Sequence, residues 1–558
     1  MGKLTRRDAV FLAALFAAGV FLFGFNLGGY GLLDPDEPFY ALSAREMLAG
    51  GDWLVPRLFG LPQFEKPVFF YWVLCASFRA LGVSEFAARV GPALAALATV
   101  GVTYFWGRTV FGRRRPAFLA AAVLATSAEF IVISRIAFTD MWLCLFVTAA
   151  FFSFSAGLEE PSRRPAAWTL FFLFAGLGFL TKGPLGLVLP LAGVLSYLWF
   201  SGRGGLVREF PWKRGLLVFA LTALPWYAAM AASHPTFLGD FFVHENLRRF
   251  FVAEHKSMDR PYFYPLGLAL GLFPWTAFLP AALFFAVRRA RKPAGGRFFF
   301  LLAAFAAPFF LLSLAKSKLL SYIFPVFPPA ALLTGGWMDA AARSLSRGAA
   351  PRKPLLWTAA FVWGVFPPAL VGGALAWCAK ERLAIAAPLW AVGFTFVPLS
   401  WAALAFLAAR RPRAAFAAAA AGVFAFAGIG FGFLLPAADS FLSSRSAGLA
   451  CRRLAVPDGS FLLGGKMYVR GFAYYAPPGP VGVVAEFPEK TFFTKHPLPF
   501  FSKPGDLASV PTSAFPVYGL LRPKELSLLK GIAGPGYAVE VLETCGPRNL
   551  VRVTKGGA

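Results

Sequence analysis

Long runs of apolar residues follow one another through most of this chain, and each run is long enough to cross a lipid bilayer. A membrane-spanning helix needs about 20 apolar residues, because the hydrocarbon core of a bilayer is about 30 Å thick. We identify thirteen such runs, at residues 9–29, 87–107, 117–134, 139–157, 166–181, 184–201, 215–233, 264–287, 298–315, 319–338, 355–377, 385–408 and 414–435. The composition agrees, since 58% of the residues are hydrophobic and only 15% are charged. A soluble multidomain protein is excluded, and a polytopic α-helical membrane protein is predicted.

The basic residues predict how these spans are oriented. The first run follows Lys3, Arg6 and Arg7 and lacks a small-residue cleavage site, so we expect a retained anchor with a cytoplasmic N-terminus. If the N-terminus is cytoplasmic and every run crosses the membrane, each basic cluster that follows an even-numbered run faces the cytoplasm, as the positive-inside bias requires. The net charge of +27 therefore reflects topology and contact with anionic headgroups, and we expect no nucleic-acid partner. The polar loops at 30–86 and 234–263 then face the periplasm.

The chain changes character after residue 437. Residues 438–558 hold no run long enough to span a membrane, but they contain short β-rich runs separated by glycine and proline turns. We therefore expect a transmembrane domain at 1–437 and a small periplasmic α/β domain at 438–558. Cys451 and Cys545 lie in this second domain, where an oxidising compartment permits a disulfide between them. Two unpaired thiols are the alternative.

The first periplasmic loop, residues 30–86, carries two acidic segments that each precede a proline and a short helix. Asp36 and Glu37 begin the first segment, and Glu65 and Lys66 form the second. A helix N-terminus favours an ionised carboxylate at such positions. Simple capping explains one segment alone, but two in one loop predict a site. We expect both helices to be amphipathic and to lie along the membrane surface.

Further ionisable residues lie on the same predicted side. Asp140 opens the fourth span, either as a helix cap or as a functional acid, since an acid at membrane depth is costly. The loop 234–263 holds three of the four histidines, and histidine with carboxylate binds divalent metals. These histidines have no fixed metal-ligand spacing, so a loop without metal is the alternative.

Five residues near the outer ends of the spans form a candidate phosphate site: Lys66, Arg260, Lys316, Lys318 and Tyr322. Together they offer the charge-assisted hydrogen bonds that an anion requires. The alternative is that the lysines simply extend toward the membrane interface. The chain contains no phosphate-binding loop of the G-x-x-x-x-G-K-[ST] type and no nucleophile elbow, so we expect no nucleotide and no protein nucleophile.

These motifs resemble those of the bacterial lipid A aminoarabinose transferases, within the wider protein O-mannosyltransferase-like group that has the GT-C fold. The resemblance rests on DPDEPFYALSAREMLAGGDWLVPRLFGLPQFEKPVFFYW, ISRIAFTDMW, FLTKGP, FFVHENLRRFF with HKSMDRPYFYP, LFPW and SKLLSYIFP, in this order. It covers residues 5–340. Beyond them only the number of spans and the outer C-terminal domain agree. The resemblance implies a GT-C membrane protein of the bacterial inner membrane.

The resemblance also implies roles for individual residues. Asp36 would be the catalytic carboxylate, with Asp140 as a second acid, and the neighbouring Glu37 is a further catalytic candidate. Glu65 and His255 would match positions that hold a divalent metal, with zinc expected. Lys66, Arg260 and Tyr322 would match the groups that bind the phosphate of a polyprenyl carrier.

We therefore expect an inverting pentosyl or hexosyl transferase that moves a sugar from a polyprenyl-phosphate carrier to an envelope acceptor. The sugar is expected to be 4-amino-4-deoxy-L-arabinose and the acceptor lipid A, although another glycan or a protein fits equally well. A protein O-glycosyltransferase of the same fold and a lipid-linked sugar transporter or flippase are the alternatives. A transporter would place its ionisable residues near the bilayer midplane, whereas here they gather at the outer ends.

Overall fold

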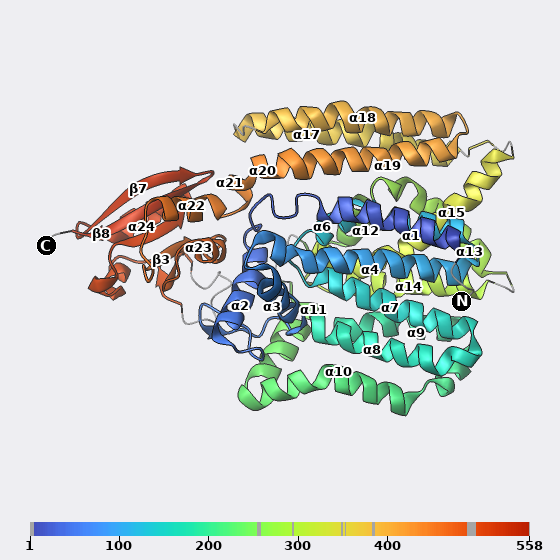
Figure 1. Cartoon of the computed structure of the whole chain (residues 1–558), viewed down its shortest axis with the longest axis horizontal. Helices are drawn as coiled ribbons and strands as arrows, with labels where there is room; N and C mark the ends of the chain where they lie inside the picture. The colour runs from blue at the N-terminus through green and yellow to red at the C-terminus, as the bar shows by residue number, and fades with distance from the viewer. Residues whose placement is uncertain are drawn as a thin grey trace.

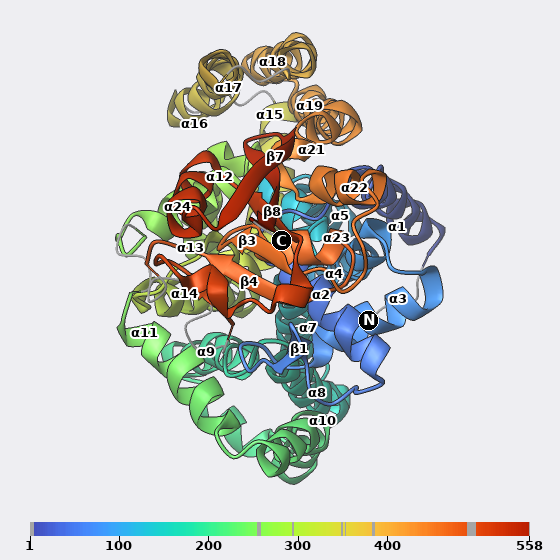
Figure 2. The ribbon, with the colours of Figure 1, turned by 90° about the vertical axis from the view of Figure 1, so that its left-hand side faces the viewer.

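A bundle of long apolar helices ends in a small sheet domain, with the N-terminus at the opposite end of the bundle (Figure 1). This computed structural model describes residues 5–253, 258–292, 295–347, 350–351, 353–381, 385–487 and 498–556. Viewed from the sheet end, the sheet domain covers the middle of the bundle, and the helices of residues 353–437 lie to one side (Figure 2).

Within the described residues, nine helical segments are long and apolar enough to cross a membrane. They contain α1 (Arg6–Gly19), α4 (Glu85–Phe111), α7 (Asp140–Glu159), α8 (Arg164–Lys182), α10 (Trp212–Ser233), α14 (Gly296–Leu314), α16 with α17 (Lys353–Ala359 and Phe366–Glu381), α18 (Ala386–Ala408) and α19 (Pro412–Ile429). These helices confirm the predicted polytopic architecture.

Two further pairs of apolar helices are bent at a short break. The helices α5 (Arg114–Ala125) and α6 (Ala128–Ser134) meet at 63°, and α12 (Phe263–Gly271) meets the segment Trp275–Ala290, which contains α13 (Leu279–Ala290), at 112°. Counting each pair as one span gives eleven in the part of the chain that the structure describes. The predicted runs 184–201 and 319–338 correspond to α9 (Leu185–Phe200) and α15 (Phe327–Ser346), which are not among the eleven. The predicted count of thirteen is therefore not confirmed.

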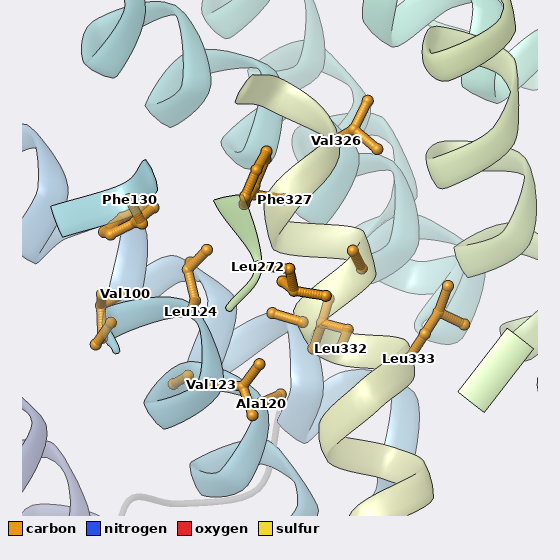
Figure 3. Packing of buried hydrophobic residues seen from close by; sticks show 14 of the residues in the cluster. Val100, Ala120, Val123, Leu124, Phe130, Leu272, Val326, Phe327, Leu332 and Leu333 are labelled. Atoms are coloured by element: carbon orange, nitrogen blue, oxygen red, sulfur yellow. The ribbon is translucent and has the colours of Figure 1, made fainter. Parts of the chain in front are cut away.

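Small residues allow the helices of this bundle to approach closely. A Cβ atom at Gly335 of α15 would lie 2.3 Å from the backbone nitrogen of Ala120 in α5. A Cβ at Gly186 would lie 1.9 Å from the backbone of Gly178, so α8 and α9 touch through their main chains. Around the contact of α5 with α15, side chains of α4, α5, α6 and α15 meet in the main apolar core, among them Val100, Leu124, Phe130 and Leu332 (Figure 3).

A buried acid ties the first helix to the bundle at the end opposite the sheet domain. Asp8 of α1 is fully buried and accepts hydrogen bonds from the Tyr104 hydroxyl (2.7 Å) and from Nε of Arg114 (3.0 Å). Arg108 forms an ion pair with the same carboxylate. Several arginines of the predicted cytoplasmic clusters are therefore paired with protein acids.

The sheet domain has six strands in the order β5-β4-β3-β6-β8-β7. The strands β5 (Phe500–Phe501), β4 (Val481–Val484), β3 (Leu462–Gly465) and β6 (Val517–Leu521) are parallel, and β8 (Arg548–Lys555) and β7 (Tyr537–Cys545) pair antiparallel. Its helices include α22 (Arg445–Arg453), α23 (Val469–Tyr475) and α24 (Pro523–Ala533). The predicted C-terminal α/β domain is confirmed.

The two cysteines of this domain do not form the predicted disulfide in the structure. Cys451 and Cys545 are free, and both are buried. Burial raises the pKa of the Cys451 thiol to about 12, and the nearby Cys545 adds to that shift. The alternative of two unpaired thiols therefore describes them.

Candidate active site

The neighbours Asp36 and Glu37 begin helix α2 (Asp36–Gly50), at the junction between the bundle and the sheet domain, but they have different environments. The Asp36 side chain is exposed, whereas Glu37 is fully buried. Successive side chains of a helix point about 100° apart, so Glu37 can face the protein interior while Asp36 faces outward. The predicted short helices are present as α2 and α3 (Phe69–Leu81).

Glu37 is a structural residue, and its assignment as catalytic is wrong. Its carboxylate accepts hydrogen bonds from the guanidinium of Arg89 at 2.6 and 2.9 Å. The backbone N–H groups of Leu33 (2.7 Å) and Ala137 (2.8 Å) donate to the same carboxylate. With both oxygens occupied and no exposed surface, Glu37 cannot contact a substrate. It joins α2 to α4 and to the segment before α7.

Asp36 is the acid of this pair that remains available for chemistry. One side of it is open, but the surrounding protein atoms desolvate the carboxyl and raise its pKa. The charges of Glu65 and Asp140 raise that pKa further, and those of Arg470 and Lys66 lower it. The two predicted acidic segments and Asp140 therefore converge on one place, together with a residue of the sheet domain.

Asp140 is held by an ion pair with Lys182. The Lys182 ammonium lies 2.6 Å from the Asp140 carboxylate, and both side chains are almost fully buried. Lys182 ends α8 and also lies 4.2 Å from the ring centre of Tyr322. Both contacts give Lys182 a defined position beside Asp140.

A cavity of about 470 Å³ lies beside these groups, and the polar residues in its lining are Glu65, Lys66, Lys182, Glu245, Asn246, Arg249, Ser317 and Tyr322. The rest of the lining residues are apolar, with Leu185 and Val188 of α9 and Leu311 and Leu312 of α14 among them. Burial lowers the pKa of Lys66, and the neighbouring Arg249 adds to that effect. The cavity thus combines positively charged side chains with an apolar wall.

The predicted phosphate site is only partly assembled. Lys66 and Tyr322 line the cavity. Lys316 and Lys318 instead pair with Asp259, at 3.3 and 2.8 Å, and Lys318 is buried. Arg260 is exposed and does not belong to the cavity lining. The structure therefore does not bring Arg260, Lys316 and Lys318 to the cavity.

Residues that were not assigned to the phosphate site contribute to the cavity. Arg249 lines it and pairs with Glu245 at 3.0 Å. Glu245 lies in η4 (Gly239–Arg248) and Arg249 directly follows it, in the loop that holds three histidines. The many charged residues of that loop were the sequence signal that could have indicated this part of the cavity. Arg470 had no such signal, since it lies far along the chain in a different domain.

The predicted zinc site stays a prediction. Among the residues that the structure describes, no three or more His, Cys, Asp or Glu side chains are grouped so that they could hold a metal ion. Glu65 lines the cavity, but His255 lies outside the described residues. A single carboxylate does not make a metal centre.

The chain resembles known membrane glycosyltransferases. Residues 9–239 match the family described as dolichyl-phosphate-mannose-protein mannosyltransferase. The undecaprenyl phosphate-α-4-amino-4-deoxy-L-arabinose arabinosyl transferase of Edwardsiella ictaluri is 38% identical over 318 residues, which is 56% of this chain and 56% of that protein. The protein of the same name from Pectobacterium atrosepticum is 34% identical over 342 residues, or 60% of each chain. The match thus spans little more than half of each relative.

The fold agrees over a longer range. The crystal structure of ArnT from Cupriavidus metallidurans bound to undecaprenyl phosphate matches with a TM-score of 0.80 at 23% identity, and the match covers 98% of both chains. The predicted resemblance and the predicted GT-C fold are thereby confirmed. Residues 9–239 are thus similar to a mannosyltransferase family, and the chain has the fold of ArnT along nearly its whole length.

Proposed function

We propose that this protein is a membrane glycosyltransferase that transfers a sugar from a polyprenyl-phosphate carrier to an envelope acceptor at the periplasmic face of a bacterial inner membrane. The observation that carries the proposal is the cavity, in which buried and half-buried cations and an apolar wall lie next to the open acid Asp36. A polyprenyl phosphate has the complementary chemistry, with an anionic head and a hydrocarbon tail.

The carrier would bind with its phosphate near Lys66 and Arg249 and its first isoprene units against the apolar wall of α9 and α14. In the transfer step, an acceptor oxygen attacks the anomeric carbon, and the bond from that carbon to the phosphate oxygen breaks. The leaving phosphate keeps the bonding electrons, and fixed cations stabilise the charge that it gains. Asp36 accepts the proton of the acceptor.

A single displacement of this kind inverts the anomeric carbon and requires no covalent enzyme intermediate. The names of the curated relatives favour 4-amino-4-deoxy-L-arabinose as the sugar and undecaprenyl phosphate as the carrier. We infer lipid A as the acceptor. A divalent metal at Glu65 and His255 is a separate expectation, and none of these steps depends on it.

The test is sugar transfer in proteoliposomes that contain the full chain, undecaprenyl-phosphate aminoarabinose and lipid A, with the products measured by lipid mass spectrometry. We expect Asp36→Asn to abolish transfer while the protein inserts and elutes as the wild type does. Asp458→Asn, which removes an exposed acid of the sheet domain, is the matched control and should transfer normally. Wild-type protein that leaves every offered acceptor unmodified would refute the proposal, and normal transfer by Asp36→Asn would refute the role of Asp36.

A further inference from the structure

The sheet domain places one of its arginines against the start of α2. Arg470 belongs to α23 and is only 5% exposed. Its guanidinium lies 4.8 Å from the ring centre of Phe39, in the first turn of α2, where Asp36 is the first residue. Arg470 therefore brings a positive charge from the C-terminal domain into the neighbourhood of the open acid.

Several contacts fix α23 in this position. Arg45 of α2 donates hydrogen bonds to the carbonyls of Tyr474 (2.7 Å) and Ala473 (3.1 Å) at the end of α23. A Cβ at Gly471 would lie 2.0 Å from the carboxylate of Asp34, so α23 meets the segment directly before α2 without spare room. Asp34 in turn binds the Ser444 hydroxyl (2.6 Å) and lies 3.2 Å from Arg548 of β8. The position of Arg470 is thus set by the docking of a whole domain.

The charges around Asp36 come from several elements: Arg470 from α23, Glu65 and Lys66 from the segment before α3, and Asp140 from α7. Tyr40 is a further titratable group that interacts with Asp36, and the Glu37–Arg89 pair is internally neutral. Among the charges that act on Asp36, Arg470 has the largest effect and lowers its pKa, opposing the burial and the two acids. Lys182, the nearest cation to Asp140, is already committed to that acid.

We propose that the C-terminal domain completes the active site, with Arg470 acting as a positioning residue that keeps the Asp36 carboxylate charged and ready to accept a proton. This inference rests on the proposed function of the same site. It assigns a role in the reaction to a domain in which sequence motifs indicate none, and it makes the docking of that domain a requirement for transfer.

The first test is the pH dependence of sugar transfer by Arg470→Gln. Without the arginine, the acidic limb of the pH profile should move upward by about one unit, so transfer at a pH below both midpoints should fall about tenfold. The KM for the carrier should stay within about twofold, because Arg470 does not line the cavity. Arg470→Lys should restore most of the activity and the profile. Arg522→Gln, which removes an arginine paired with Glu525 in the same domain, is the control.

A purely structural role for Arg470 predicts a different result. In that case transfer falls without a shift of the acidic limb, and Arg470→Lys fails together with Arg470→Gln. That outcome would overturn the proposal, as would an unchanged profile in Arg470→Gln.

A second measurement does not depend on transfer activity. Dicyclohexylcarbodiimide modifies protonated carboxyls in apolar surroundings, so the pH at which half of Asp36 is labelled, read by peptide mass spectrometry, reports its ionisation. We expect this midpoint to rise by about one unit in Arg470→Gln and to stay near the wild-type value in Arg470→Lys. EDTA is present throughout, so that no divalent cation contributes.

These two measurements separate failure of this inference from failure of the proposed function. If the wild type transfers no sugar but the labelling midpoint shifts, the function is wrong and the link between Arg470 and Asp36 stands. If transfer occurs and the midpoint does not move, the inference is wrong. If Arg470→Gln does not insert into the membrane, Arg470→Lys takes its place in the test. A labelling midpoint of Asp36 that moves by about one unit in Arg470→Lys, although the positive charge is retained, would overturn the inference.

Discussion

At the scale of single residues, the most informative contrast is between adjacent acids that the sequence presents as a pair. The Asp36 side chain is exposed. The Glu37 side chain is buried, and its carboxylate is bound by the guanidinium of Arg89 and by two backbone N–H groups. A buried ion pair of this kind adds little net stability when complete, but it is costly to break. The two acids therefore predict opposite phenotypes.

We expect Glu37→Gln to destabilise the protein by about 3 kcal/mol, since it leaves the fully buried charge of Arg89 without its counter-ion. Asp36→Asn should change stability by less than about 0.5 kcal/mol, because its side chain is exposed. Chemical unfolding in detergent, followed by tryptophan fluorescence, measures both. Equal stability of the two variants would contradict the structural role of Glu37.

The pair of Lys182 and Asp140 permits a double-mutant test. Lys182→Met leaves a buried carboxylate unpaired and should cost about 3 kcal/mol. Adding Asp140→Asn removes the stranded charge, so the double variant should recover most of that loss. The same unfolding assay applies. If the two losses simply add, the ion pair contributes nothing to the fold.

At the scale of elements, close backbone contacts decide which helices can meet. The glycines of α8 and α9 let two helices touch, and Gly471 lets α23 pack against the segment that precedes α2. Both contacts depend on the absence of a side chain. The first contact lies within the membrane bundle, and the second connects the bundle to the sheet domain.

Gly471→Ala should displace α23 from α2, because the added Cβ would meet the Asp34 carboxylate at 2.0 Å and the Ser444 hydroxyl at 2.9 Å. We expect transfer to fall at least tenfold while the bundle still inserts. Limited proteolysis should cleave the chain between the two domains faster than in the wild type. Gly531→Ala is the control, since its Cβ has no neighbour within 4 Å, and it should behave as the wild type does. Unchanged cleavage in Gly471→Ala would show that α23 tolerates the methyl group.

At the scale of the whole molecule, the number of spans matters less for topology than whether it is odd. Nine described segments qualify, and eleven do when each bent pair counts once. The sequence predicted thirteen. All three counts are odd, so each places the sheet domain on the side opposite the N-terminus.

An alkaline phosphatase fused after residue 556 should therefore be active, because that enzyme folds only in the oxidising periplasm. The same reporter fused after Arg411, in the basic loop that follows the twelfth predicted run, should be inactive. Reporter activity in intact cells, normalised to fusion protein level, gives the answer. Activity at Arg411 and none at the C-terminus would reverse the orientation.

Apolar length and turn composition predicted most of the spans and the α/β domain, because these features depend on local sequence alone. The acidic loop and Asp140 were predicted to share a site, and the structure places Glu65 and Asp140 within electrostatic reach of Asp36. Burial of Glu37 was not predictable, since Arg89 and Ala137, which satisfy it, lie on other segments. The pairing of Lys316 and Lys318 with Asp259 and the arrival of Arg470 depend on tertiary packing for the same reason.

The buried Asp8 carries a consequence for how the protein is made. Its partners Tyr104 and Arg114 follow it by 96 and 106 residues, so they leave the ribosome well after it does. Until they arrive, the Asp8 carboxylate has its capping contact with Thr5 but lacks the contacts that join the first helix to the bundle. Assembly therefore proceeds out of chain order, and the earliest segment to enter the membrane waits for its later neighbours before it is locked in place.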